Sequence, residues 1–313
     1  MTNSQVSLQD KAIVVGLDAS DESAAAAAWA AREAEERGRP LVAVRAFDWH
    51  WPPMPVPTSG AVSVLEPNAE GVRSAVQAQL DRGVAEIRRE HPGLEVGAAL
   101  ADGHPAIALA TVADETDAEL VVVGASGSGA VERVLLGSTA SELVRTTHRP
   151  AVVVRGTAQR SNADRVVVGV DGTPTSRRAM GFALDFAARH GHRVGVVHAW
   201  TESLLDPMLE SFMPQQGGEN GLRAIAEFLV SSQLEDWRAQ YPDVPVEHVG
   251  PEGRPAGALL EQAEDAAMLV VGSHGRGPLR RTLLGSVSHR VLQHAPCPVA
   301  VLRELDDGDN DRL

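Results

Sequence analysis

The sequence predicts an α/β protein made of two tandem, doubly wound domains, each with a mostly parallel five-stranded sheet flanked by helices. Short β-branched runs alternate with longer helical segments, and the same motifs return in the same order in the second half of the chain. The runs are apolar on consecutive positions, as expected for central parallel strands that are covered on both faces. Such alternation favours a sheet joined by right-handed crossovers.

Matching segments show that the chain is a duplication. Residues 12–20 (AIVVGLDAS) match residues 165–173 (RVVVGVDGT), and the later matches keep the same order: 41–47 with 194–200, 100–109 with 250–259, 120–127 with 268–275, and 148–155 with 295–303. The polar stretch at 156–164 has the composition of a linker. The expected division is therefore residues 1–156, residues 164–304 and an acidic, solvated tail at 305–313.

The first helix of each copy has recognisable ends. Ser20 is the expected N-cap in the first copy, acidic residues follow it, and Gly38 is expected to end the helix. In the second copy Thr173 is the expected cap, and Pro174 occupies the first helical position, where the missing N–H has no consequence.

Composition limits the classes of partner. The 313 residues are enough for two domains of roughly 150 residues each. A net charge of −14 argues against binding to nucleic acid or to an anionic membrane surface. Cys297 is the only cysteine, and residues 1–11 do not resemble a signal peptide. A cytoplasmic protein is the expectation.

Long crossovers separate the second strand of each copy from the next helical segment. Residues 48–68 and 201–220 are rich in proline and glycine, so little regular structure is expected there. Lids over a binding site and disordered connections are both open readings. Trp49 and Trp51 lie in the first crossover, where covering a ligand and simple local packing are equally compatible with the sequence.

A glycine pattern of the form G-x2-G-x9-G-S occurs once in each copy, in identical register. Its members are Gly124, Gly127, Gly137 and Ser138 in the first copy, and Gly272, Gly275, Gly285 and Ser286 in the second. The first glycine follows the fourth strand, at the carboxyl edge where open α/β sheets bind ligands. Glycines allow a phosphate to approach the backbone, and the helix that begins at the serine offers free N–H donors. The pattern therefore predicts phosphate binding without lysine.

Two familiar glycine signatures do not fit. A P-loop needs a lysine, and the only lysine is Lys11; a dinucleotide fingerprint would follow the first strand, where neither copy has it. A purely structural strand-to-helix loop is the alternative, which the identical register of two copies disfavours.

One aspartate follows the first strand of each copy. Asp18 and Asp171 could cap the next helix, although Ser20 and Thr173 already fill that role. The favoured interpretation is a carboxylate that faces the crevice, where it accepts hydrogen bonds from ribose or helps to position Mg²⁺.

These motifs resemble the universal stress protein family, in the tandem form common in actinobacteria. The segments VVVGVDGT, LVVGSHGRG and LLGSVSHRVLQHAPCPVAVLR carry the resemblance. It implies Rossmann-like domains that bind ATP, usually with Mg²⁺, and a role in stress response or dormancy rather than metabolic catalysis. It also implies pairing through the last strands, Ala151–Arg155 and Val299–Arg303, within the chain. Further homo-oligomerisation and the protein partner are left open.

The resemblance implies nucleotide-binding residues in both copies, with no catalytic or metal-ligating set. In the first copy these are Gly16, Asp18, Ala46, Gly124, Ser126, Gly127, Ser128, Gly129, Gly137, Ser138 and Thr139. In the second they are Gly169, Asp171, Ala199, Gly272, His274, Gly275, Arg276, Gly277, Gly285, Ser286, Val287 and Ser288.

The copies differ in ways that predict unequal sites. Ser288 supplies a hydroxyl where the first copy has Ala140, and Arg276, Arg280 and Arg281 lie in the second loop. The second copy is therefore expected to bind the triphosphate more tightly. A regulatory ATP-binding protein is favoured over two alternatives, a slow ATPase and a scaffold with degenerate sites.

Overall fold

The computed structural model describes residues 11–48, 69–127, 136–156, 163–199, 231–235, 237–250, 253–275 and 284–304. The first half contains β1 (Ile13–Gly16), α1 (Asp21–Arg37), β2 (Leu41–Phe47), α2 (Ala69–Glu90), β3 (Val96–Asp102), α3 (Pro105–Glu115), β4 (Leu120–Gly124), α4 (Ser138–Thr146) and β5 (Ala151–Val154). The second half contains β6 (Arg165–Gly169), α5 (Pro174–His190), β7 (Arg193–Val197), β8 (Val246–Val249), α8 (Pro255–Gln262), β9 (Met268–Gly272), α9 (Ser286–His294) and β10 (Val299–Leu302). The predicted crossovers, with Trp49 and Trp51, lie outside the described residues.

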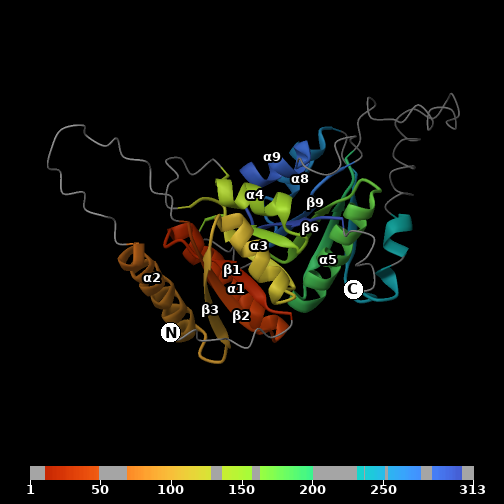
Figure 1. Cartoon of the computed structure of the whole chain (residues 1–313). Coiled ribbons are helices and arrows are strands. Elements are labelled where there is room, and N and C mark those ends of the chain that lie inside the picture. The colour runs from red at the N-terminus through yellow and green to blue at the C-terminus, as the bar shows by residue number, and fades with distance from the viewer. Residues whose placement is uncertain are drawn as a thin grey trace, which may run out of the picture.

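The ten strands in the described part of the chain form one sheet in the order β3-β2-β1-β4-β5-β10-β9-β6-β7-β8. Neighbouring strands within each half are parallel, and the halves meet where β5 and β10 run antiparallel, with Val153 opposite Val299. The pairing of the last strands expected within the chain is therefore confirmed. The second half repeats the strand order of the first in the opposite direction across this junction. Figure 1 shows α4, α8 and α9 close together on one side of the molecule.

Helices cover both faces of the sheet because its strands are apolar on consecutive positions. Ile13 and Val15 of β1 face a core built with α1, α2 and α5, whereas Val14 between them faces a core built with α3, α4, α8 and α9. Both cores continue across the junction between the halves. Trp29 and Cys297 are both buried.

The helix ends follow the sequence. The hydroxyl of Ser20 accepts a hydrogen bond from the N–H of Ser23 at 3.1 Å, and Thr173 caps α5 through Ser176 at 3.2 Å. Gly38 ends α1 with a φ of 60°, in the left-handed region that favours glycine. These end assignments are confirmed.

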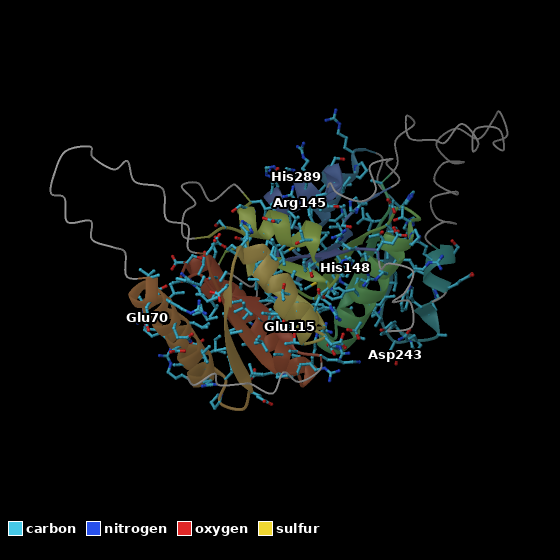
Figure 2. The ribbon with its side chains drawn as sticks, viewed as in Figure 1. Glu70, Glu115, Arg145, His148, Asp243 and His289 are labelled. Carbon is cyan, nitrogen blue, oxygen red and sulfur yellow. The ribbon has the colours of Figure 1, made fainter. Side chains whose placement is uncertain are left out.

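Several charged side chains lie on the outside of the helices and connections. Glu70, Glu115 and Asp243 are exposed (Figure 2). In the described part of the chain, none of the helices combines the length and apolar character needed to cross a membrane.

Candidate functional site

The predicted crevice lies at the carboxyl edge of the sheet in both halves. β1 pairs with β2 on one side and with β4 on the other, so the connections that leave β1 and β4 diverge at this edge. β6 has the same relation to β7 and β9. Such a switch point is where open α/β sheets leave room for a ligand.

Asp18 contacts two parts of the predicted site in the first half. Its Oδ1 accepts hydrogen bonds from the hydroxyl of Ser20 and from the Ser20 N–H at 3.0 Å, so the carboxylate is fixed at the start of α1. Its Oδ2 lies against Gly127, where an added Cβ would come within 2.6 Å of the oxygen. The carboxylate therefore already fills the space that a side chain at position 127 would need.

Asp171 repeats this geometry in the second crevice. Its Oδ1 accepts from the N–H of Thr173 at 3.1 Å and from the hydroxyl at 2.6 Å. A Cβ at Gly275 would lie 2.8 Å from the Asp171 Oδ2. The structure thus brings each predicted aspartate together with the second glycine of its motif.

The first glycine of each motif is required by packing. A Cβ at Gly124 would lie 2.8 Å from the backbone carbon of Glu22, in the first turn of α1. At Gly272 it would lie 2.9 Å from the Thr175 side chain of α5. These close contacts hold the first helix of each half against the end of β4 or β9.

The third glycine of each motif is the N-cap of a helix. The N–H of Gly137 donates to the Ala125 carbonyl at 2.7 Å, and Gly285 donates to Ser273 at 2.8 Å, so α4 and α9 begin beside the strand ends. Within the described residues, no side chain caps either helix. The first-turn N–H groups of α4 and α9 therefore face the crevice edge as potential anion donors.

Ser288 and Ala140 mark a difference between the halves. The Ser288 hydroxyl is buried and donates to the carbonyl of Gly272 at the end of β9. Ala140 occupies the same place in α4 and is also buried. The hydroxyl predicted to bind nucleotide thus bonds to the strand end, and the first half lacks this tie.

The other predicted residues take varied positions. Gly16 and Gly169 pack against Leu109 and Leu259, where a Cβ would come within 3.1 Å of either leucine. The remaining described residues lie at strand ends, in the loop that follows β4 or β9, or in the first turns of α4 and α9: Ala46, Ala199, Ser126, His274, Ser138, Thr139, Ser286 and Val287. The ring Nδ1 of His274 lies 2.7 Å from the hydroxyl of Ser273.

Some predictions lie outside the described residues. These are the predicted contacts Ser128, Gly129, Arg276 and Gly277, and the loop arginines Arg280 and Arg281.

Arg45 lies beside the predicted site of the first half, although none of the sequence motifs includes it. Its Nη1 donates to the Leu17 carbonyl at 3.2 Å, directly before Asp18. Burial lowers the pKa of the Arg45 guanidinium, and the charge of Asp18 opposes that shift. A charged residue within a central parallel strand was the sequence signal that could have identified Arg45 as a candidate site residue. In the repeat, His198 occupies the position that corresponds to Arg45 in the second half.

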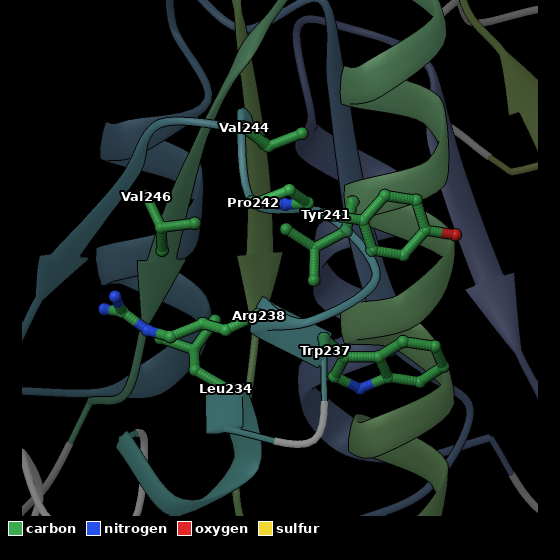
Figure 3. A pocket seen from close by; sticks show the side chains of 8 residues that line it. Leu234, Trp237, Arg238, Tyr241, Pro242, Val244 and Val246 are labelled. Carbon is green, nitrogen blue, oxygen red and sulfur yellow. The ribbon is translucent and has the colours of Figure 1, made fainter.

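A separate cavity of about 310 Å³ lies beside α5 in the second half (Figure 3). It is lined by Leu184, Leu234, Trp237, Arg238, Tyr241, Pro242, Val244 and Val246. None of the predicted nucleotide-binding residues is among them, so this cavity is distinct from the crevices. Among the described side chains, no cluster of three or more His, Cys, Asp or Glu residues could hold a metal ion.

Comparison with known proteins identifies the family. The model of the universal stress protein family matches residues 11–155 and again residues 162–303. The chain belongs to the universal stress protein family. Universal stress protein Rv2005c of Mycobacterium tuberculosis is 38% identical over 300 residues, which cover 93% of this chain and 97% of the relative. The sequence resemblance is therefore confirmed over nearly the whole chain.

One solved structure supports the same fold over nearly its whole length. A universal stress protein from Archaeoglobus fulgidus covers 94% of this chain and 99% of its own, with a TM-score of 0.65 at 17% identity. Another A. fulgidus universal stress protein, solved in complex with dAMP, covers 46% of this chain and 98% of its own, with a TM-score of 0.34 at 26% identity. The tandem α/β architecture predicted from the sequence is confirmed.

Proposed function

We propose that this universal stress protein binds ATP at two sites, one in each half, and acts as a stress-response or dormancy regulator in the cytoplasm. The observation that carries the proposal is the repeated arrangement of a fixed carboxylate, a glycine without space for a side chain, and an uncapped helix start at one sheet edge. The proposal includes the domain bounds 1–156 and 164–304, with 305–313 as a tail.

The phosphates would lie at the starts of α4 and α9. Ser138 and Ser286 are exposed, so their hydroxyls and the first-turn N–H groups can donate to an anion without moving a packed side chain. A helix N-terminus also carries the positive end of the dipole, which stabilises a phosphate without any lysine. The backbone near Ala46 and Ala199 would contact adenine, at the ends of β2 and β7.

Asp18 and Asp171 would contact ribose or a phosphate-bound Mg²⁺. In each aspartate Oδ1 is bonded at the helix cap, and Oδ2 lies beside the second glycine of the motif. Mg²⁺ is usually held by one or two carboxylates together with substrate phosphates, so one aspartate in each crevice suits it. When bound, the ion would neutralise phosphate charge; the chain's own residues orient the nucleotide.

Mass spectrometry of gently purified full-length protein tests the proposal. Co-purified ATP or ADP is expected, and calorimetry on nucleotide-free protein should show two ATP sites. Gly127→Arg together with Gly275→Arg should abolish retention, because each new side chain would occupy the place next to the aspartate. Gly93→Arg is the matched control, since nothing lies within 4 Å of a Cβ there.

The outcomes separate the alternatives. Unchanged retention in the folded double variant would refute the loop assignment. Retention of ADP alone, with phosphate release from added ATP, would favour a slow ATPase, and the absence of any nucleotide would favour a scaffold. Single variants test the predicted inequality: the chain with Gly127→Arg should bind ATP more tightly than the chain with Gly275→Arg, and equal affinities would refute it.

A further inference from the structure

The antiparallel junction brings the end of each last strand to the other half. β5 and β10 lie side by side in opposite directions, with Ala151 opposite Val301. Arg155 and Arg303 directly follow these two strands. Each arginine can therefore contact the helix that precedes the last strand of the opposite half.

Both arginines make this contact. The Nη2 of Arg155 donates to the carbonyl of Leu292 in α9 at 2.9 Å, and Nη1 of Arg303 donates to the carbonyl of Arg145 in α4. Each carbonyl lies in the last turn of its helix, where carbonyl groups have no intrahelical partner and the dipole is negative. The two halves thus cap each other's helices reciprocally.

The capped helices are those that begin at the proposed phosphate sites. α4 and α9 each have 9 residues, so each is roughly 13 Å long. A phosphate at the N-terminus and a guanidinium at the C-terminus would both stabilise the same short helix. A nucleotide that orders α9 in the second half would therefore also fix the position of Arg155 of the first half, because Arg155 bonds to α9.

Arg155 is connected back to the first crevice. The Oε2 of Glu22 accepts from the N–H of Gly156 at 3.0 Å, and the charge of Glu22 acts on the half-buried Arg155 guanidinium. The backbone of Glu22 is the group packed against Gly124, the first glycine of the motif.

The second half has a corresponding connection. Arg178 of α5 donates to the carbonyl of Arg303, and α5 packs against Gly272 through Thr175. A continuous set of contacts therefore joins each proposed phosphate site to the helix of the other.

We propose that the two nucleotide sites bind cooperatively because Arg155 and Arg303 exchange these helix caps. This inference rests on the proposed function. The first nucleotide orders one short helix and the arginine that caps it. Binding of the second nucleotide then costs less conformational entropy. The coupling should be positive and about fivefold or greater in affinity, at the low end of the usual range.

Calorimetry on six full-length proteins measures the coupling. The chains with Gly127→Arg and with Gly275→Arg each report the association constant of one ATP site, and the wild-type chain reports the overall constant for two. Independent sites give an overall constant equal to the product of the single-site values. We expect the wild-type value to exceed this product about fivefold or more, and the chain with both Arg155→Met and Arg303→Met, compared with its own single-site variants, to show no excess.

Arg149→Met is the matched control. Arg149 is partly buried and bonds within the first half, to Asp117 at 2.6 Å, so its loss should leave the coupling unchanged. Amide hydrogen exchange gives a readout that does not depend on the methionine variants: ATP added to the chain with Gly127→Arg should protect amides of α4, although only the second site is intact.

The possible failures are distinguishable. A wild-type overall constant within twofold of the product, coupling that persists without both arginines, or exchange in α4 that ignores ATP at the second site would each overturn the coupling alone. A wild-type chain that binds no ATP would overturn the proposed function and the coupling with it.

Discussion

At the residue scale, the paired aspartates show how one side chain links a helix start to a binding loop. One oxygen of Asp18 is bonded at the cap of α1, and the other lies against Gly127. The same division of roles at Asp171 and Gly275 makes the glycines necessary even before any ligand binds. The proposed phosphate loop is therefore shaped by its own carboxylate.

The residue after each aspartate has a backbone conformation in the left-handed region, so substitutions there can measure backbone strain. Ala19 has a φ of 64°, and Gly172 has a φ of 86° at the same place in the second half. The left-handed region costs an L-residue about 1–2 kcal/mol, and glycine costs more conformational entropy on folding. Ala19→Gly should raise the unfolding free energy by about 0.5–1 kcal/mol, and Gly172→Ala should lower it by about 1–2 kcal/mol.

Urea unfolding of the full chain, followed by circular dichroism, measures both changes. The two substitutions are reciprocal, so each serves as the other's control. Destabilisation by both, or by neither, would contradict the strain explanation.

Residue types and spacing identified the aspartates, the glycines and the serines as candidate site residues, because these residues form patterns that are local in the sequence. The partner of Ser288 could not be predicted, since its hydroxyl bonds to Gly272, 16 residues away in the chain. Arg45 was missed for a related reason: its place beside Leu17 depends on the register of β1 with β2.

At the element scale, the alternation of strands and helices predicted the parallel order within each half, because crossovers between parallel strands are right-handed. The antiparallel contact of β5 with β10 does not follow from alternation. It was expected only from the resemblance to proteins that pair through their last strands. The order of strands and helices within one half does not specify which of its surfaces packs against the other half.

Two glycines inside helices of the second half differ in the space around them, so alanine substitutions there can measure the cost of packing. A Cβ at Gly181 of α5 would lie 2.5 Å from the ring of Trp237, next to the cavity, whereas nothing lies within 4 Å of a Cβ at Gly257 of α8. Gly181→Ala should lower the unfolding free energy by about 1–3 kcal/mol because Trp237 must move. Gly257→Ala should raise it by about 0.5–1 kcal/mol through helix propensity.

Chemical denaturation with tryptophan fluorescence reports on both variants. An unchanged midpoint for Gly181→Ala, with Gly257→Ala stabilised as expected, would show that the ring adjusts without cost.

At the scale of the whole molecule, a buried charge cluster joins the halves. Glu33 of α1 is 2% exposed and accepts hydrogen bonds from Arg37 of the same helix and from His190 of α5 at 2.9 Å. Arg37 also lies 3.3 Å from Asp185 of α5. Trp29 stacks on Phe186 beside this cluster, with ring centroids 6.4 Å apart.

This cluster could not be predicted from the sequence. Glu33 and His190 are 157 residues apart in the chain, and each reads as an ordinary polar position on an amphipathic helix. Only the antiparallel junction, which places α1 and α5 on the same face, brings them together. Contacts between residues that are near each other in the sequence could be predicted from it, whereas contacts between distant residues could not.

Burial opposes the ionisation of Glu33, but the hydrogen bond from His190 and the charge of Arg37 outweigh it, so the pKa of Glu33 lies below its usual value. A lowered folded-state pKa means that the stabilising contribution is complete above the unfolded pKa of about 4.3 and is lost as the pH falls through the folded value. Acid should therefore weaken the contact between the halves.

Glu33→Gln should lower the unfolding free energy at pH 7 by roughly 1–3 kcal/mol, because the buried Arg37 loses the nearest of its charged partners and keeps only Glu119 and Asp185, each at 3.3 Å. Since protonation removes the same charge from the wild-type chain, the difference between the two proteins should shrink as the pH falls from about 5 to 3. Glu86→Gln on the exposed face of α2, where Glu86 pairs with Arg89 at 3.3 Å, is the matched control and should change stability by less than about 1 kcal/mol. Urea unfolding across this pH series measures all three proteins. A difference that stays constant or grows in acid would mean that the Glu33 charge does not hold the halves together.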